Sequence, residues 1–326
     1  MKDRLLIKTL LIVNTTIISL NTNAQQEINN LILPEDYPTI PFETPLKVDK
    51  IGKGKSHIII IPGLGHGVET YQEFAESLSK NFTSHLINVP GYGNTASYPL
   101  PGGSYGNQIW TDTVKYKIAE YAVANNLNEL IVIGNHQVST QMAVRLGIDY
   151  PDLVKAVIIA GGPTALNVAN MPQVTPALRA SQQDLQYAPN WFKTVSPETW
   201  KNGSLLPSYY SKDAEVAQEI WNRVTNNNIP VMIQYVEEYF SQDTEFDFNH
   251  ITVPTHVFIP GFSNIPANVP LTATAAAYDL MLKDPWVRGA EKNEMIKTIA
   301  APESHTMVVL DSPDLVKEKL LEIIGK

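Results

Sequence analysis

The 326-residue sequence contains no cysteine. This excludes disulfides, cysteine-ligated zinc or iron–sulfur sites, and a cysteine nucleophile. The sequence also lacks any run rich in lysine and arginine, and its 24 basic residues against 33 acidic ones give a formal net charge of −9. Because a phosphate backbone needs a basic surface, we expect no nucleic-acid partner.

Long apolar runs are scarce as well, and the amino terminus holds a short one. Lys2, Arg4 and Lys8 precede a mostly apolar stretch at 10–20, which is followed by small residues. This order is typical of a secretory signal peptide. The stretch contains polar residues and is shorter than the ~20 apolar residues that span a bilayer. We therefore expect a cleaved signal over 1–24, no stable membrane anchor, and a secreted or periplasmic protein.

From residue 57 onward, short apolar runs alternate with segments of helical period. Runs of this kind, ended by glycine or proline, are typical of strands buried on both faces of a parallel sheet. The alternation predicts right-handed crossovers and a doubly wound, mostly parallel α/β sheet. The predicted strands are 57–61, 84–89, 130–133, 154–160, 253–259 and 296–299, and the predicted helices are 71–78, 110–125, 140–149, 273–282 and 313–324.

Between residues 164 and 250 the strand pattern disappears and the segments become helical and rich in aromatic residues. Most of these aromatics suit the segment's own core, and a few suit a pocket wall. The pattern predicts an inserted helical lid at 164–250. The remaining divisions are an N-terminal extension at 25–54 and a core formed by 55–163 and 251–326.

Three stretches together resemble the α/β-hydrolase fold. They are 58–65, which ends in Pro62-Gly63-Leu64-Gly65; 130–154, a strand, a turn and a helix; and 303–313, which contains Glu303-Ser304-His305. The resemblance covers about residues 55 to 322. It implies a serine on a strained elbow after a strand, an acid that orients a histidine base, and two backbone N–H groups that hold the oxyanion.

The elbow departs from this pattern. It reads Gly134-Asn135-His136-Gln137-Val138-Ser139. Counting forward from the strand, with Gly134 as the first glycine, places His136 at the nucleophile position, whereas counting back from the helix places Gln137 there. Histidine has a nucleophilic side chain and glutamine has none suited to acyl transfer. Ser139 falls in the first helical turn, where serine is typical of a cap, and would serve as the nucleophile only if the turn is remodelled.

The acid position departs as well, whereas the base position agrees. After the strand at 253–259 the family usually has Gly-x-x-Asp, and this sequence has Gly261 followed by Asn264. Asparagine orients a histidine by accepting its N–H but does not offset an imidazolium charge. His305 lies past the last predicted strand, where the resemblance places the general base.

The glycine-rich loop after the first predicted core strand supplies the remaining candidates. The resemblance implies that the N–H of Leu64 is an oxyanion donor and that Gly63, His66 and Gly134 line the pocket. Three converging histidines would bind a metal ion, but no short-spaced ligand pair supports such a site. We therefore expect no metal and no cofactor.

Three functional hypotheses follow. The first is an exported hydrolase of a small ester, amide or lactone with a non-standard active site. The second is a proton-transfer enzyme, a lyase or isomerase, in which His136 and His305 move protons. The third is a catalytically inactive protein that binds a ligand in the same pocket. All three take a small molecule as the partner, and the fold does not choose among them.

Overall fold

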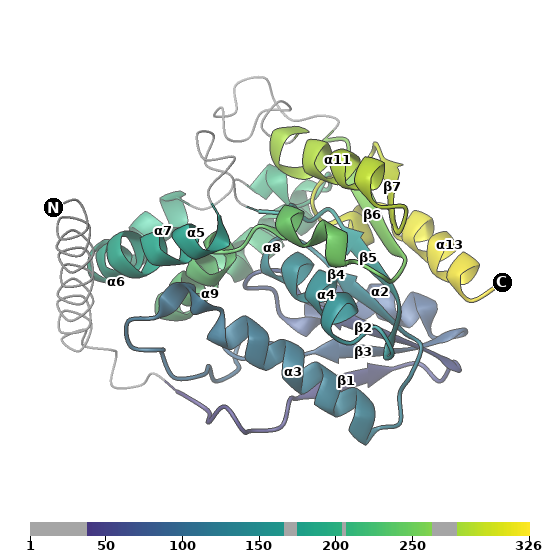
Figure 1. The fold of residues 1–326 in the computed structure, drawn as a ribbon, viewed down its shortest axis with the longest axis horizontal. Coiled ribbons are helices and arrows are strands. Elements are labelled where there is room, and N and C mark those ends of the chain that lie inside the picture. The colour runs from purple at the N-terminus through teal and green to yellow at the C-terminus, as the bar shows by residue number, and fades with distance from the viewer. Residues whose placement is uncertain (1–37, 166–174, 204–206, 263–278) are drawn as a thin grey trace, which may run out of the picture.

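A computed structural model describes residues 38–165, 175–203, 207–262 and 279–326 (Figure 1). The predicted signal peptide at 1–24 and Asn264 lie outside these ranges, as does most of the helix predicted at 273–282. Within the described ranges, no helix combines the length and the apolar character needed to cross a bilayer.

The central feature is a seven-stranded sheet with the order β1-β3-β2-β4-β5-β6-β7. Strand β1 runs antiparallel to β3, and every other neighbouring pair is parallel. The prediction of a mostly parallel α/β sheet is confirmed. The strands are β1 (Val48–Ile51), β2 (Ser56–Ile61), β3 (Phe82–Ile87), β4 (Leu130–Gly134), β5 (Val154–Ala160), β6 (Thr255–Pro260) and β7 (Ile296–Ala301).

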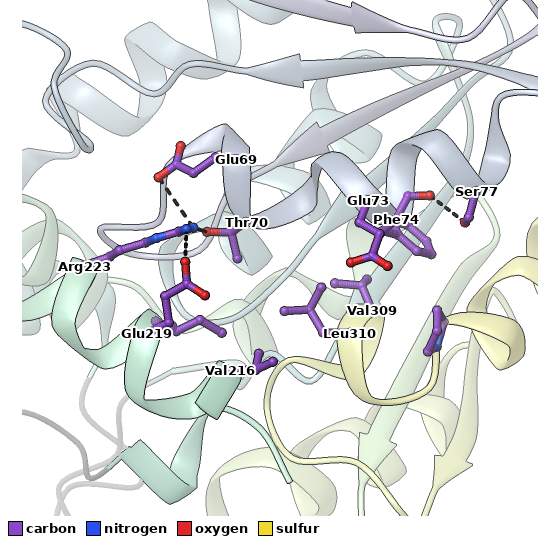
Figure 2. Close-up of a pocket in the computed structure, with 12 residues that line it drawn as sticks. Glu69, Thr70, Glu73, Phe74, Ser77, Val216, Glu219, Arg223, Val309 and Leu310 are labelled. Atoms are coloured by element: carbon purple, nitrogen blue, oxygen red, sulfur yellow. Dashed lines mark hydrogen bonds and ion pairs between the residues drawn. The ribbon is translucent and has the colours of Figure 1, made fainter. Parts of the chain in front are cut away.

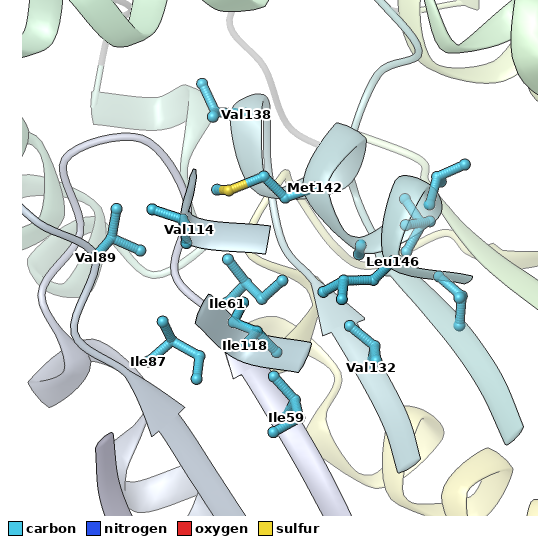
Figure 3. Packing of buried hydrophobic residues seen from close by; sticks show 14 of the residues in the cluster. Ile59, Ile61, Ile87, Val89, Val114, Ile118, Val132, Val138, Met142 and Leu146 are labelled. Carbon is cyan, nitrogen blue, oxygen red and sulfur yellow. The ribbon is translucent and has the colours of Figure 1, made fainter. Parts of the chain in front are cut away.

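Helices cover both faces of the sheet (Figure 1). Successive side chains of a strand point to opposite faces, so the unbroken isoleucine run of β2 supplies both layers. Ile59 and Ile61 pack with Val132 against the helices of one face (Figure 3), while Ile58 and Ile60 pack against those of the other. The first face carries α3 (Ile109–Ala124) and α4 (Val138–Asp149), and the second carries α2 (Gln72–Leu78) and α13 (Pro313–Ile323).

A set of helices is inserted between β5 and β6, and we call its described part, 175–203 and 207–250, the helical insert. It contains α5 (Pro176–Gln182), η3 (Gln183–Tyr187), α6 (Ala188–Thr194), α7 (Pro197–Gly203), η4 (Pro207–Tyr209), α8 (Ala214–Thr225), α9 (Ile229–Phe240) and η5 (Thr244–His250). The other short elements are η1 (Val68–Tyr71), η2 (Tyr105–Asn107), η7 (Asp279–Lys283), α11 (Asp284–Lys292) and α12 (Val308–Asp311).

A buried carboxylate joins the helical insert to the core. Glu238 of α9 accepts the backbone N–H groups of Trp110 and Thr111, at 2.9 and 2.8 Å, and so caps the first turn of α3. Burial raises the pKa of Glu238 to about 7, and these N–H donors oppose that rise. A carboxylate at a helix N-terminus satisfies otherwise unpaired donors and the helix dipole. The insert is therefore held against the core at a defined position.

The two-sided core makes a direct prediction for stability. Ile131 of β4 is 1% exposed, so Ile131→Ala is expected to lower the free energy of unfolding by about 2–5 kcal/mol through lost contacts and a cavity. Val123, on the outer side of α3, is 63% exposed. Val123→Ala is expected to change the free energy of unfolding by less than about 0.5 kcal/mol. Urea denaturation measures both, and equal effects would contradict the assignment of the core.

Candidate active site

The strand-to-helix turn after β4 is short and strained. Strand β4 ends at Gly134 and α4 begins at Val138, so three residues make the turn. Two of them have positive φ, with His136 at 68° and Gln137 at 50° with ψ −122°. Non-glycine residues seldom adopt such angles, and strain of this kind concentrates at functional sites. Gln137 is the partly exposed residue of the turn and directly precedes the helix.

The turn passes close beneath the start of α4, which explains Gly134. A Cβ atom on Gly134 would lie 2.5 Å from the carbonyl oxygen of Ser139. The Ser139 hydroxyl is fully buried, accepts the N–H of Asn135 at 2.9 Å, and lies 2.7 Å from the carbonyl oxygen of Asn135 and 3.1 Å from that of His136. In this structure the Ser139 hydroxyl is used to hold the turn together.

The loop after β2 lies against this turn because β2 and β4 are neighbours, with Ile61 paired to Gly134. A Cβ atom on Gly63 would lie 2.6 Å from the carbonyl oxygen of Asn135 and 3.2 Å from the Cβ of His136. A glycine at position 63 therefore permits a close approach between the two loops.

Two backbone donors belong to the adjoining loops, Leu64 in the loop after β2 and Val138 directly after Gln137. The residues that the structure describes supply no hydrogen-bond acceptor to the N–H of Leu64 or to that of Val138, the residue after Gln137. Buried N–H groups are nearly always paired, so these two donors near a strained turn are open to an acceptor beyond the described residues. The neighbouring N–H of Gly63 is already used, since it donates to the Tyr71 hydroxyl at 3.0 Å.

Two of the predicted histidines lie together under the helical insert. The rings of His66 and His136 stack with their centroids 5.8 Å apart. His136 also makes edge-to-face contacts with Tyr209 and Tyr210, at centroid distances of 5.5 and 5.6 Å. His66 Nδ1 lies 3.1 Å from the Tyr71 hydroxyl. Among the described residues, neither ring nitrogen of His136 has a hydrogen-bond partner. The elbow histidine is therefore enclosed by aromatic rings.

Burial sets the charge of both histidines. It lowers the pKa of His66 from 6.5 to about 3, and the Arg223 cation lowers it further. Burial also lowers the pKa of His136 well below 6.5, with His66 adding to the effect. Desolvation penalises the imidazolium form, so both rings are neutral at neutral pH.

His305 lies in the loop after β7, on the far side of an aromatic pair. Its ring stacks on Phe262 at 5.5 Å, and Phe262 stacks on Tyr209 at 5.8 Å. Tyr209 in turn contacts His136. The fold thus brings His136 and His305 to the same rim, with Tyr209 and Phe262 between them.

A carboxylate that the sequence analysis did not assign joins the His305 loop to the helical insert. Asp311 accepts the backbone N–H of His305 at 2.7 Å, the Ser211 hydroxyl at 2.5 Å and the N–H of Lys212. Beside it, the carbonyl oxygens of Tyr209 and Tyr210 accept the N–H groups that follow His305 in the chain. No motif marks Asp311 or Tyr209, because Asp311 meets Ser211 and Tyr209 meets Thr306 only in the folded chain. Tyr71 is not marked either, because its place in the predicted helix at 71–78 suits a core residue.

Metal binding finds no support in this part of the chain. Across 38–165, 175–203, 207–262 and 279–326, no group of three or more His, Asp or Glu side chains is arranged to hold a metal ion.

The sheet order, the crossovers and the sharp strand-to-helix turn are those of the α/β-hydrolase fold, as the sequence motifs predicted. Solved structures agree. The chain is similar to an esterase from Exiguobacterium antarcticum (TM-score 0.62, 14% identity, 86% of this chain and 96% of that chain). It is also similar to an enol-lactonase from Burkholderia xenovorans LB400 (TM-score 0.60, 13% identity, 86% and 96%).

The matches to curated sequences cover a smaller part of each chain than the structural matches do. The chain is 26% identical over 147 residues to a pimeloyl-[acyl-carrier protein] methyl ester esterase from Proteus mirabilis, which covers 44% of this chain and 51% of that protein. A protein of the same description from Cronobacter sakazakii is 36% identical over 47 residues, or 14% of this chain and 18% of that protein. The chain thus spans about half the length, or less, of these curated relatives. No family model matches the chain.

The buried histidines predict a pH dependence of stability. As the pH falls below 6.5, the imidazole of His136 binds a proton more readily in the unfolded chain than in the folded one, so the free energy of unfolding falls. In His136→Phe this loss is expected to be smaller, by up to about 1.4 kcal/mol per pH unit. Urea denaturation from pH 8 to 4.5 measures it. His250→Phe, at an exposed position, is the control, and identical slopes in all three proteins would contradict the assignment.

Proposed function

We propose that the chain hydrolyses a small ester, amide or lactone by direct attack of water, without an acyl-enzyme intermediate. The observation that carries the proposal is the strained turn at Gln137, with the N–H of Val138 next to it and that of Leu64 in the adjoining loop, neither of which has an acceptor among the described residues. A substrate carbonyl oxygen held by these two donors is stabilised as it becomes an oxyanion. Since the Gln137 amide is not a nucleophile suited to acyl transfer, water is the attacking group.

The other groups of the rim have complementary roles in the proposal. His305 accepts the proton of the attacking water and then donates it to the leaving group. The side-chain oxygen of Gln137 accepts a hydrogen bond from the same water and orients it. The proposal keeps the sequence-based hypothesis that Asn264 orients the His305 ring. The lowered pKa of His136 makes it a poor base, so it is a wall of the pocket in this scheme and not a proton carrier.

Substrate size and location complete the proposal. Tyr209 and Tyr210 lie over the turn, so the helical insert acts as a lid and admits a small acyl group only when these rings move. By their descriptions, the Proteus mirabilis relative acts on a methyl ester and the Burkholderia xenovorans protein on an enol lactone, which supports this substrate class. The signal-like segment at 1–24 supports export.

The same enclosure favours a second candidate function. Rings that cover His136 block water as well as substrate, as in a catalytically inactive protein that retains the pocket to bind a ligand. The two candidates differ in one respect that can be measured, which is turnover.

The hydrolytic proposal is tested by replacing the base. The full chain is assayed with p-nitrophenyl acetate, p-nitrobutyranilide and γ-butyrolactone. His305→Ala is expected to lower kcat by about 10²-fold or more, because a general base is worth at least that much. His250→Ala, at an exposed position far along the chain from the motifs, is expected to leave kcat unchanged. A parent chain that binds these molecules without turnover supports the binding candidate and contradicts hydrolysis.

The elbow assignment is tested by restoring a nucleophile. The parent chain is expected not to react with a fluorophosphonate probe, whereas Gln137→Ser places a hydroxyl on the strained turn beside the oxyanion donors and is expected to react. Gln141→Ser, one helical turn further along α4, is the matched control. Labelling of the parent chain at Ser139 would contradict the assignment.

A further inference from the structure

A groove lies between the core and the helical insert, apart from the candidate active site. It has a volume of about 400 Å³, which is within the usual range for small-molecule sites. Its walls are η1 and α2 on one side, α8 of the insert on the second, and α12 with the start of α13 on the third (Figure 2). It is lined by Glu69, Thr70, Glu73, Phe74, Ser77, Val216, Glu219, Ile220, Arg223, Val309, Leu310 and Pro313.

The floor of the groove is apolar. Phe74, Ile220 and Val309 are buried at its base, with Val216 and Leu310 partly exposed beside them. An aliphatic chain laid along this floor removes apolar surface from water on both partners.

The rim of the groove is acidic. It carries three carboxylates, Glu69, Glu73 and Glu219, and one cation, Arg223, so its formal charge is 1 − 3 = −2. Arg223 contacts Glu219, lies 3.6 Å from Glu69 and donates to the Thr70 hydroxyl at 2.9 Å (Figure 2). The cation is thus already engaged by side chains of the rim.

Glu73 is the carboxylate left for a ligand. It makes no hydrogen bond or ion pair with any described residue, and Figure 2 shows it directed toward Val309 and Leu310 across the groove. A negative group at the edge of an apolar floor is complementary to a molecule with a positive head and an aliphatic tail. An anionic fatty acid would place like charges together, and a neutral alcohol would leave the rim charge uncompensated.

We propose that this groove binds a small alkylammonium ion, with the ammonium at Glu73 and the aliphatic chain on Phe74, Val309 and Leu310. The site is separate from the proposed hydrolytic centre and does not depend on it. Since η1 and α2 of the core and α8 of the insert all line the groove, a ligand bound there contacts both the core and the insert.

Isothermal titration of the full chain with n-hexylammonium, 1-hexanol and hexanoate tests the proposal. Hexylammonium is expected to bind about threefold or more tightly than hexanol, as expected for an ion pair at an exposed rim, and hexanoate is expected to bind most weakly. Affinity is expected to rise by up to about fourfold for each methylene from butyl- to hexylammonium, because each lies on the apolar floor.

The variant E73Q locates the binding. It is expected to remove the preference for hexylammonium over hexanol. The matched control, E76Q, changes an exposed carboxylate on the same helix that does not line the groove, and it is expected to keep the preference. Thermal unfolding verifies that both variants are folded. Equal affinities for hexylammonium and hexanol in the parent chain, or an unchanged preference in E73Q, would overturn the proposal.

Discussion

The structure of the candidate site depends on one constraint, which is that the chain turns from β4 into α4 within three residues. The turn is possible because Gly134 has no side chain that would clash with the backbone of Ser139. The buried Ser139 hydroxyl also accepts a hydrogen bond from the N–H of Asn135 in the turn. The turn holds His136 and Gln137 at positive φ, and no residue that the structure describes supplies an acceptor to the N–H of Val138. Strain maintained by the surrounding fold is typical of a site under functional constraint.

The helical insert completes the site from the other side. The backbone of Tyr209 and Tyr210 is joined to the chain just past His305, and Asp311 holds that loop and the insert with a single carboxylate. The rings that cover the elbow and the loop that carries the predicted base are therefore mechanically connected. If the rings moved without the His305 loop, buried hydrogen bonds between them would break, and each buried polar group left unpaired costs free energy.

Much of the fold could be predicted from the sequence, because the strands at 58–61 and 130–133 are unbroken apolar runs and the helices keep a clear period. The elbow could not be resolved, since Gly134 permits two counts and the choice between His136 and Gln137 depends on backbone angles. Asp311 was missed because its partner Ser211 is distant in sequence, and Tyr71 was missed because the helical period of 71–78 assigns it to a buried apolar face. Asn264 and the signal-like segment at 1–24 stay predictions. The absence of cysteine excludes disulfides, and it also excludes the usual substitute for serine at the turn.

The central claim is that no covalent intermediate forms on the turn, because Gln137 offers no nucleophile. Peptide mass spectrometry after rapid acid quench and proteolysis, during reaction with excess p-nitrophenyl acetate, tests it most directly. The account predicts release of nitrophenol with no 42 Da increase in mass on the peptide that carries 130–145, where 42 Da is roughly the mass of one acetyl group that nucleophilic catalysis would leave behind. An acetyl adduct on that peptide which forms and decays at the rate of turnover would contradict it.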